Sequence, residues 1–149
     1  MSSDFPGWFS PGIAISTGGD SMKIRESAEN YLEVILILGQ NGSQVRSVDI
    51  AAALDFTKAS VSIAMKKLRQ DAYIETDTTG HISLTEAGRK IAESIYEKHT
   101  LISNWLISLG VEEQTAIDDA CAMEHVLSDE SFLAIKKHIG ECCCGDMLR

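Results

Sequence analysis

Two short helical patterns that almost touch constrain the fold of this chain most strongly. In residues 47–54 and 57–71, apolar side chains recur at spacings of three and four, and only two residues separate the stretches. Ser47 and Thr57 are residue types that cap helices, so we expect them to start the two helices. Two short helices joined by a tight turn form a helix-turn-helix pattern. The second helix is expected to bury one stripe of side chains: Val61, Ala64, Met65 and Leu68.

Two β-prone runs follow directly, in residues 73–76 and 81–84. The residues between them, Asp-Thr-Thr-Gly, are typical of a turn, so the runs predict a hairpin. A hairpin after a helix-turn-helix is the wing of a winged helix. Together with a helix expected over residues 27–40, these elements assign residues 22–85 to a winged helix-turn-helix domain.

The rest of the chain predicts helices and no strands. A long helix is expected over residues 85–109, with Gly110 as its stop, and two more over 112–127 and 129–139. Residues 86–139 would therefore form an all-helical second domain. The expected fold class is mainly α.

The two ends of the sequence differ from this pattern. Residues 1–21 hold four of the eleven glycines and both prolines, with no helical or strand period, which indicates a disordered arm. Residues 140–149 contain Cys142, Cys143 and Cys144 and few other apolar side chains. They are expected to form a flexible, cysteine-rich tail.

The charge of the chain is distributed unevenly. The formal net charge is −9, which taken alone argues against nucleic acid as a partner and in favour of cations. However, every charged residue within 57–70 is positive, and every charged residue within 112–130 is negative. The second helix of the helix-turn-helix is therefore locally basic, and the overall charge does not exclude DNA.

The face of this basic helix opposite its apolar stripe has the residue types that read a major groove. Lysines suit phosphate or guanine, serines offer polar contacts, and Ile63 suits a thymine methyl group. A solvated basic face that binds nothing is the alternative. An apolar Ile63 on a polar face, together with the order of the elements, favours DNA. The predicted DNA-contacting residues are Lys58, Ala59, Ser60, Ser62, Ile63, Lys66 and Lys67.

A second pattern indicates a metal site. Cys121, Glu124 and His125 stand at positions i, i+3 and i+4, so a helix brings a thiolate, a carboxylate and an imidazole to one face. Such a mixed set suits a divalent transition metal better than magnesium or calcium. The alternative is ordinary packing, with a buried cysteine, a core histidine and a solvated glutamate.

These motifs occur in segments that resemble the diphtheria toxin repressor family, which includes iron-dependent repressors and manganese transport regulators. Residues 118–130 resemble the metal-binding and dimerisation segment of that family, and residues 29–33, 48–51 and 84–88 follow in register. The resemblance implies a homodimeric transcription factor that binds palindromic operator DNA when it is loaded with Fe(II) or Mn(II). Without the SH3-like domain of larger members, the chain is expected to be the short form.

The resemblance also implies a set of ligands. His99 falls on a ligand of the second family site, and Glu33 on a ligand of manganese-type members. Asn30 stands where iron-type members have methionine and manganese-type members aspartate. Three residues fall on ligands of the main family site: Cys121, Glu124 and His125.

The metal is expected to be Fe(II) first and Mn(II) second, because the Cys121 thiolate is softer than the carboxylate of manganese-type members. Co(II), Ni(II) and Zn(II) are expected to substitute in vitro. We hypothesise that the metal ties the helix over residues 27–40 to the Cys121 helix and His99. Glu33 would make this connection, with Asn30 as a further candidate. This connection would fix the DNA-reading head relative to the dimer core.

Two other functions stay open at this point. One is a winged-helix regulator that senses oxidation or a small molecule through Cys121 and the tail thiols. The other is a metal-buffering protein whose main site contains His138 and the cysteine triplet.

The remaining expectations concern function classes and location. No nucleophile elbow, phosphate loop or zinc-hydrolase motif occurs, so no enzyme and no small-molecule substrate are expected. No apolar run reaches about 18 residues, so no membrane contact is expected. Adjacent cysteines make a poor disulfide framework, which favours the cytoplasm. The expected partners are double-stranded operator DNA and a second copy of the chain.

Overall fold

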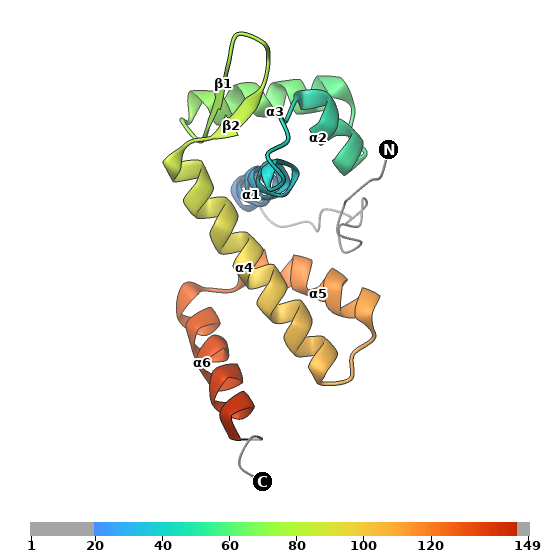
Figure 1. Cartoon of the computed structure of the whole chain (residues 1–149), viewed down its shortest axis with the longest axis vertical. Coiled ribbons are helices and arrows are strands. Elements are labelled where there is room, and N and C mark those ends of the chain that lie inside the picture. The colour runs from blue at the N-terminus through green and yellow to red at the C-terminus, as the bar shows by residue number, and fades with distance from the viewer. Residues whose placement is uncertain (1–19, 146–149) are drawn as a thin grey trace. The chain divides into compact units, whose positions relative to one another are not determined.

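The structure, a computed structural model, describes residues 20–145, with side chains from 25 to 142 (Figure 1). This part of the chain forms six helices and one two-stranded hairpin in the order α1 (Asp20–Gly39), α2 (Ser47–Leu54), α3 (Lys58–Gln70), β1 (Ile74–Thr76), β2 (Ile82–Leu84), α4 (Glu86–Ser108), α5 (Glu113–Val126) and α6 (Asp129–Gly145). The chain divides into two compact units, the first ending at Tyr96 and the second beginning at Glu97. The predicted class, a winged helix-turn-helix followed by a helical domain, is confirmed.

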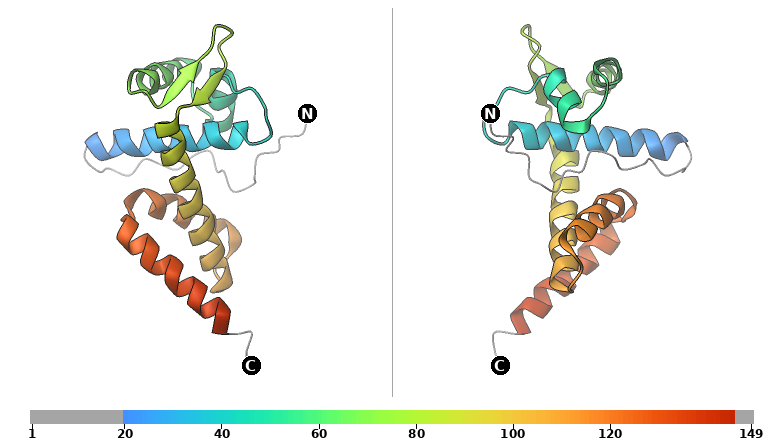
Figure 2. Two further views of the ribbon diagram at one scale, coloured as in Figure 1. Left: turned by 60° about the vertical axis from the view of Figure 1, so that its left-hand side comes forward. Right: turned by 90° about the vertical axis from the view of Figure 1, so that its right-hand side faces the viewer.

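The first unit is built on α1, which crosses beneath α2, α3 and the hairpin (Figure 2). The buried side of α1 meets the buried sides of α2 and α3 in one apolar cluster. In α3, the predicted stripe is buried at three positions and half-buried at Ala64. The largest fully buried apolar side chains of this cluster are Leu32, Val34, Ile50, Val61 and Ile74.

The helix starts follow local capping chemistry. The Thr57 hydroxyl accepts a hydrogen bond from the Ser60 backbone N–H at 3.2 Å, as predicted. The prediction of Ser47 as the cap of α2 was wrong. The cap is Arg46, whose backbone N–H donates to the Asp49 carboxylate at 2.9 Å, because that side chain reaches back from the first turn of the helix.

The hairpin is short and has a defined register. β1 and β2 are antiparallel, with Ile74 opposite Leu84 and Thr76 opposite Ile82. A further bridge pairs Ile82 with Val45, and the Ile82 N–H donates to the Val45 carbonyl at 2.7 Å. The wing is therefore held to the segment between α1 and α2 as well as closed on itself.

The second unit contains the later part of α4 together with α5 and α6. Ile102 of α4, Ala116 and Ala120 of α5, and Phe132 of α6 are buried within it. The Lys98 ammonium contacts the Asp129 carboxylate at 2.8 Å, which joins α4 to the start of α6. Gly110, at φ 95°, follows the last turn of α4 and stops the helix, as the sequence predicts.

Both predicted irregular ends are shorter than expected where the structure describes them. Residues 20 and 21 belong to α1, because neither glycine nor proline occurs between Gly19 and Gly39 to break a helix. Residues 140–145 continue α6 instead of starting a tail. Contacts one helical turn apart, Lys137 with Glu141 and His138 with Cys142, span Gly140. The rest of the expected arm and tail lies outside the described residues.

Across residues 20–145, no helix combines the length and apolarity that a bilayer crossing requires.

Candidate metal centre and nucleic-acid interface

Three predicted ligands meet inside the second unit, and we call His99, Cys121 and Glu124 the core cluster. His99 Nδ1 lies 2.9 Å from Glu124 Oε2 and 3.5 Å from Cys121 Sγ. One donor atom from each residue lies within 4.8 Å of the other two. His99 and Glu124 are each only 2% exposed, whereas Cys121 is half-buried.

The helices explain this convergence. Cys121 and Glu124 are three residues apart on α5, so both face α4, where His99 lies on the buried side. The Ser103 hydroxyl donates to the His99 backbone carbonyl at 2.8 Å within α4. At the other end of α5, backbone and side-chain donors of Thr115 and the Gln114 backbone N–H lower the pKa of the capping Glu112 carboxylate. The Glu112 cap therefore sets the start of α5, the helix that carries the Cys121 and Glu124 donors.

His125 takes a place beside the cluster. Its Nε2 lies 3.3 Å from Glu124 Oε1, and its side chain is 7% exposed. Glu124 Oε1 thus faces His125, and Glu124 Oε2 faces His99. The Glu124 carboxylate therefore lies between two imidazoles. The sequence places His125 next to Glu124 on α5, but the contact with His99 comes from the packing of α4 against α5.

The donor set of the core cluster fits a divalent transition metal. Donors that share one ion through bonds of about 2.0–2.3 Å lie roughly 3–4.5 Å apart, which matches the compactness of the cluster. The set contains one sulfur, one nitrogen and one carboxylate oxygen, as borderline-soft metals prefer. Burial of a carboxylate beside a thiol is costly without a cationic partner. The geometry therefore suits cation binding.

The two predicted ligands of α1 belong to the other compact unit. Glu33 is buried and Asn30 is half-buried, three residues apart on the helix. A buried glutamate in a mostly apolar stretch is unusual and needs a reason beyond packing. Their participation in the same metal site stays a prediction.

Lys98 is the site neighbour that sequence reasoning missed. It is buried next to His99, contacts the Asp129 carboxylate at 2.8 Å, and lies 5.8 Å from the centre of the Phe132 ring. Its position at the edge of the apolar stripe of α4 was the available signal. Lys98 holds the start of α6 close to the turn of α4 that carries a cluster residue.

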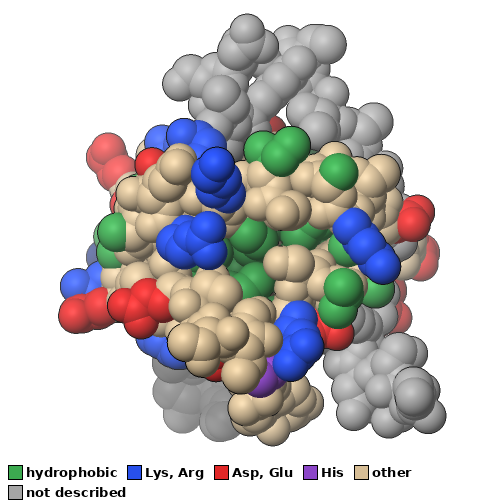
Figure 3. Space-filling view, turned by 90° about the horizontal axis from the view of Figure 1, so that it is seen from above, with side chains coloured by type: hydrophobic (Ala, Val, Ile, Leu, Met, Phe, Trp, Pro, Cys, Tyr) green, Lys and Arg blue, Asp and Glu red, His purple; other side chains and the backbone are tan. Residues whose placement is uncertain are grey.

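The predicted DNA-contacting residues form one exposed face on the first unit. All seven are exposed, and Ile63 is 72% exposed although it is aliphatic. Figure 3 looks onto the side of α3 and the hairpin, where Lys and Arg side chains lie across the surface and Asp and Glu lie mostly at its edges. This face therefore combines positive charge with an exposed aliphatic side chain, and both kinds of side chain can contact DNA in a major groove.

The tip of the wing is ordered by one carboxylate. Asp77 accepts hydrogen bonds from the Thr79 hydroxyl at 2.7 Å, the His81 backbone N–H at 2.9 Å and the Thr79 backbone N–H at 2.8 Å. These donors, the Thr79 hydroxyl foremost, hold the pKa of Asp77 well below its usual range. The tip carries no Lys or Arg, so it offers shape rather than positive charge.

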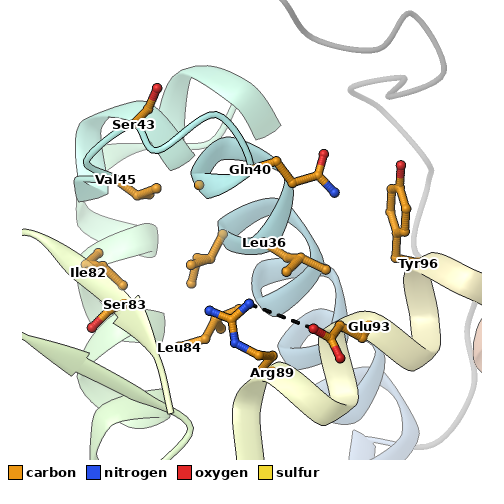
Figure 4. A pocket seen from close by; sticks show the side chains of 12 residues that line it. Leu36, Gln40, Ser43, Val45, Ile82, Ser83, Leu84, Arg89, Glu93 and Tyr96 are labelled. Carbon is orange, nitrogen blue, oxygen red and sulfur yellow. Dashed lines mark ion pairs between the residues drawn. The ribbon is translucent and has the colours of Figure 1, made fainter. Parts of the chain in front are cut away.

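The first unit also contains a pocket of about 540 Å³ between α1, the following loop, β2 and the start of α4 (Figure 4). Leu36, Val45 and Leu84 line it, and its charged groups, Arg89 and Glu93, pair with each other at 3.8 Å. Its lining includes no thiol and no imidazole. The pocket is therefore not a second transition-metal site.

Comparison with known proteins covers both units. Residues 23–82 match the family model of the iron dependent repressor, N-terminal DNA binding domain. Residues 85–146 match that of the iron dependent repressor, metal binding and dimerisation domain. Together these matches extend over most of the chain.

Two relatives are similar over about three quarters of the chain. An uncharacterised HTH-type transcriptional regulator of Methanocaldococcus jannaschii is 34% identical over 113 residues, covering 74% of this chain and 90% of that protein. The transcriptional regulator MntR of Escherichia coli O6:H1 is 34% identical over 112 residues, covering 75% of this chain and 72% of that protein. Nothing in these similarities supports the alternative of a redox or small-molecule sensor.

Solved structures are similar in fold. The manganese regulator SloR superposes with a TM-score of 0.69 at 27% identity, and the metal-dependent transcriptional regulator MtsR with 0.70 at 26%. In each case the match covers 76% of this chain and 53% of the other, so the chain spans about half the length of these proteins.

Proposed function

The chain belongs to the iron-dependent repressor family, whose members are metal-dependent transcriptional repressors and not enzymes, and we propose that it represses genes of metal homeostasis. In this proposal it binds palindromic operator DNA as a homodimer when the core cluster holds Fe(II) or Mn(II). Its proposed place of action is the cytoplasm, because the relatives it matches are regulators of archaea and bacteria, whose DNA lies there.

The core cluster carries the proposal. His99, Cys121 and Glu124 would hold the ion, with His125 beside them and Glu33 as a predicted further donor. When bound, a divalent ion supplies positive charge that compensates the thiolate and the carboxylate. The residues themselves hold the metal-binding side of α5 against α4, since His99 contacts both α5 donors.

Fe(II) is the first choice and Mn(II) the second. The Cys121 thiolate supports Fe(II), because sulfur ligands favour the later, softer metals over Mn(II). The names of several relatives, which are manganese regulators, support Mn(II). Both ions need a deprotonated thiol and neutral imidazoles, so either should bind less tightly in mild acid.

The exposed face of α3 supports binding to a palindromic operator. Lys66 and Lys67 would contact phosphate or guanine, and Ile63 would contact a thymine methyl group. Reading two half-sites requires two α3 helices about 34–36 Å apart on the DNA. A dimer provides two copies of α3, and the second unit carries exposed apolar side chains that a second copy would cover: Ile107, Leu109, Val126 and Leu133.

An anaerobic comparison of Mn(II), Fe(II), Co(II) and Zn(II) tests the proposal. For each ion, metal content and affinity for a DNA duplex selected from random sequence would be measured on the same protein. We expect one ion per core cluster and tighter DNA binding in each loaded form than with chelator. Between the two proposed ions, we expect the chain to bind Fe(II) more tightly than Mn(II). Tighter binding of Mn(II) would reverse the metal assignment, and DNA affinity independent of every ion would reject the function.

A further inference from the structure

A second set of metal donors occurs on α6, outside the core cluster. His138, Glu141 and Cys142 are exposed and stand at positions i, i+3 and i+4 of the helix. This is the spacing of Cys121, Glu124 and His125 on α5, with thiol and imidazole exchanged. The spacing again brings three different donor types to one helical face.

Two of these donors already lie at the separation that a shared metal ion requires. His138 Nε2 and Cys142 Sγ are 3.6 Å apart. Bonds of about 2.3 Å to sulfur and about 2.05 Å to nitrogen, meeting near the tetrahedral angle, place the two ligand atoms about 3.6 Å apart. An ion could therefore bind between them without rearrangement of the helix.

We propose that His138 and Cys142 form a surface site for a thiophilic divalent cation of the zinc class at the end of α6, with Glu141 on the same helical face as a further donor. Sulfur and imidazole nitrogen are the donors that zinc prefers in proteins, and neither suits magnesium or calcium. Glu141 is close to Lys137, at 3.9 Å, and would exchange this exposed ion pair for the metal at little cost.

The exposed position sets the properties of the site. Water fills the coordination positions that the protein leaves open, so the ion binds more weakly and exchanges faster than in the buried core cluster. The inference does not depend on the proposed regulatory function, because none of its donors belongs to the core cluster or to the face of α3.

Co(II) absorption tests the site, because a thiolate bound to Co(II) gives a charge-transfer band in the near ultraviolet. The background is Cys121→Ser, which removes the core thiolate. In this background, Cys142→Ser is compared with the matched double variant Cys143→Ser/Cys144→Ser, and circular dichroism checks the fold of each protein. A parallel titration of Zn(II) compares His138→Ala with its parent.

The band should persist in Cys121→Ser and in the variant that also lacks Cys143 and Cys144, and it should disappear when Cys142 is replaced. His138→Ala should weaken Zn(II) binding at the exposed site at least about tenfold, since a direct ligand is lost. A folded Cys121→Ser protein without the band, or a band that survives Cys142→Ser, overturns the proposal. If Cys121→Ser does not fold, Zn(II) stoichiometry decides: His138→Ala/Cys142→Ser must bind one ion fewer than the unsubstituted chain.

Discussion

The imidazole of His99 and the carboxylate of Glu124 face each other at 2.9 Å across the packing of α4 and α5, and both are almost completely buried. Buried ionisable groups are retained only where they are compensated. Here the half-buried thiol of Cys121 completes a compact set of three donor types. This relationship supports our proposal that the second unit binds a metal ion.

Replacement of Glu124 should remove metal binding and leave the fold. Glu124→Gln keeps the size of the side chain and a hydrogen-bonding oxygen but loses the negative charge, so we expect metal affinity to fall at least about 100-fold, or about 2.7 kcal/mol. Isothermal titration with Mn(II) measures the change. Glu130→Gln, at an exposed carboxylate of α6, is the matched control and should bind as the unsubstituted chain does.

Replacement of Lys66 should weaken DNA binding through the phosphate backbone. Lys66→Ala removes one exposed positive charge from the face of α3, so affinity should drop for all sequences and the salt dependence should become shallower by about one charge. Fluorescence anisotropy at several salt concentrations measures both effects. Lys90→Ala removes an exposed lysine of α4 that pairs with Glu86, and an equal loss there would argue against α3 as the interface.

Two glycines in helices should respond to alanine with opposite signs. A methyl group on Gly88 would collide with the backbone carbonyl of Tyr73, so Gly88→Ala should destabilise the first unit by about 1–3 kcal/mol. Gly140 of α6 has open space around it, and Gly140→Ala should stabilise its helix by about 0.4–1 kcal/mol. Urea unfolding of both variants measures the difference, and equal effects would contradict the packing described for Gly88.

The wing should keep its structure in mild acid. The pKa of Asp77 is lower in the folded wing than in the unfolded chain, where it is about 3.9. Its contribution to stability is therefore complete above the unfolded value and is lost only as the pH falls through the lower folded value. Hydrogen exchange at the Thr79 and His81 amides should show unchanged protection factors between pH 7 and 5. Asp77→Ala should expose both amides, and persistent protection would disprove the role of this carboxylate.

Patterns along the chain predicted the elements and the faces they bury. The Thr57 cap follows from its residue type. The buried stripe of α3 and the exposure of Ile63 follow from helical spacing, because spacing decides which residues share a face. The same logic placed Cys121 and Glu124 together on α5. Residue type and spacing within one helix were sufficient for these features.

Features that depend on contacts between elements were harder to predict. The resemblance marked His99 as a ligand but gave no partner for it, and Lys98 was missed. Their contacts with Glu124 and Asp129 arise from the packing of α4 against later segments. The cap of α2 was missed because the backbone of Arg46 starts the helix, and a cap can come from the Asp49 side chain inside the first turn. The spacing of apolar residues along the chain predicts neither contacts between helices nor this kind of cap.

The central claim is that metal in the core cluster strengthens DNA binding, and it is tested most directly by one titration. The affinity of the chain for a selected palindromic duplex is measured without oxygen, once with saturating Fe(II) and once with chelator, together with Glu124→Gln. Coupling free energies between two sites are typically about 1–3 kcal/mol, so we predict that the loaded chain binds roughly 5–150-fold more tightly and that Glu124→Gln does not respond to metal. Equal affinity with Fe(II) and with chelator would contradict the account.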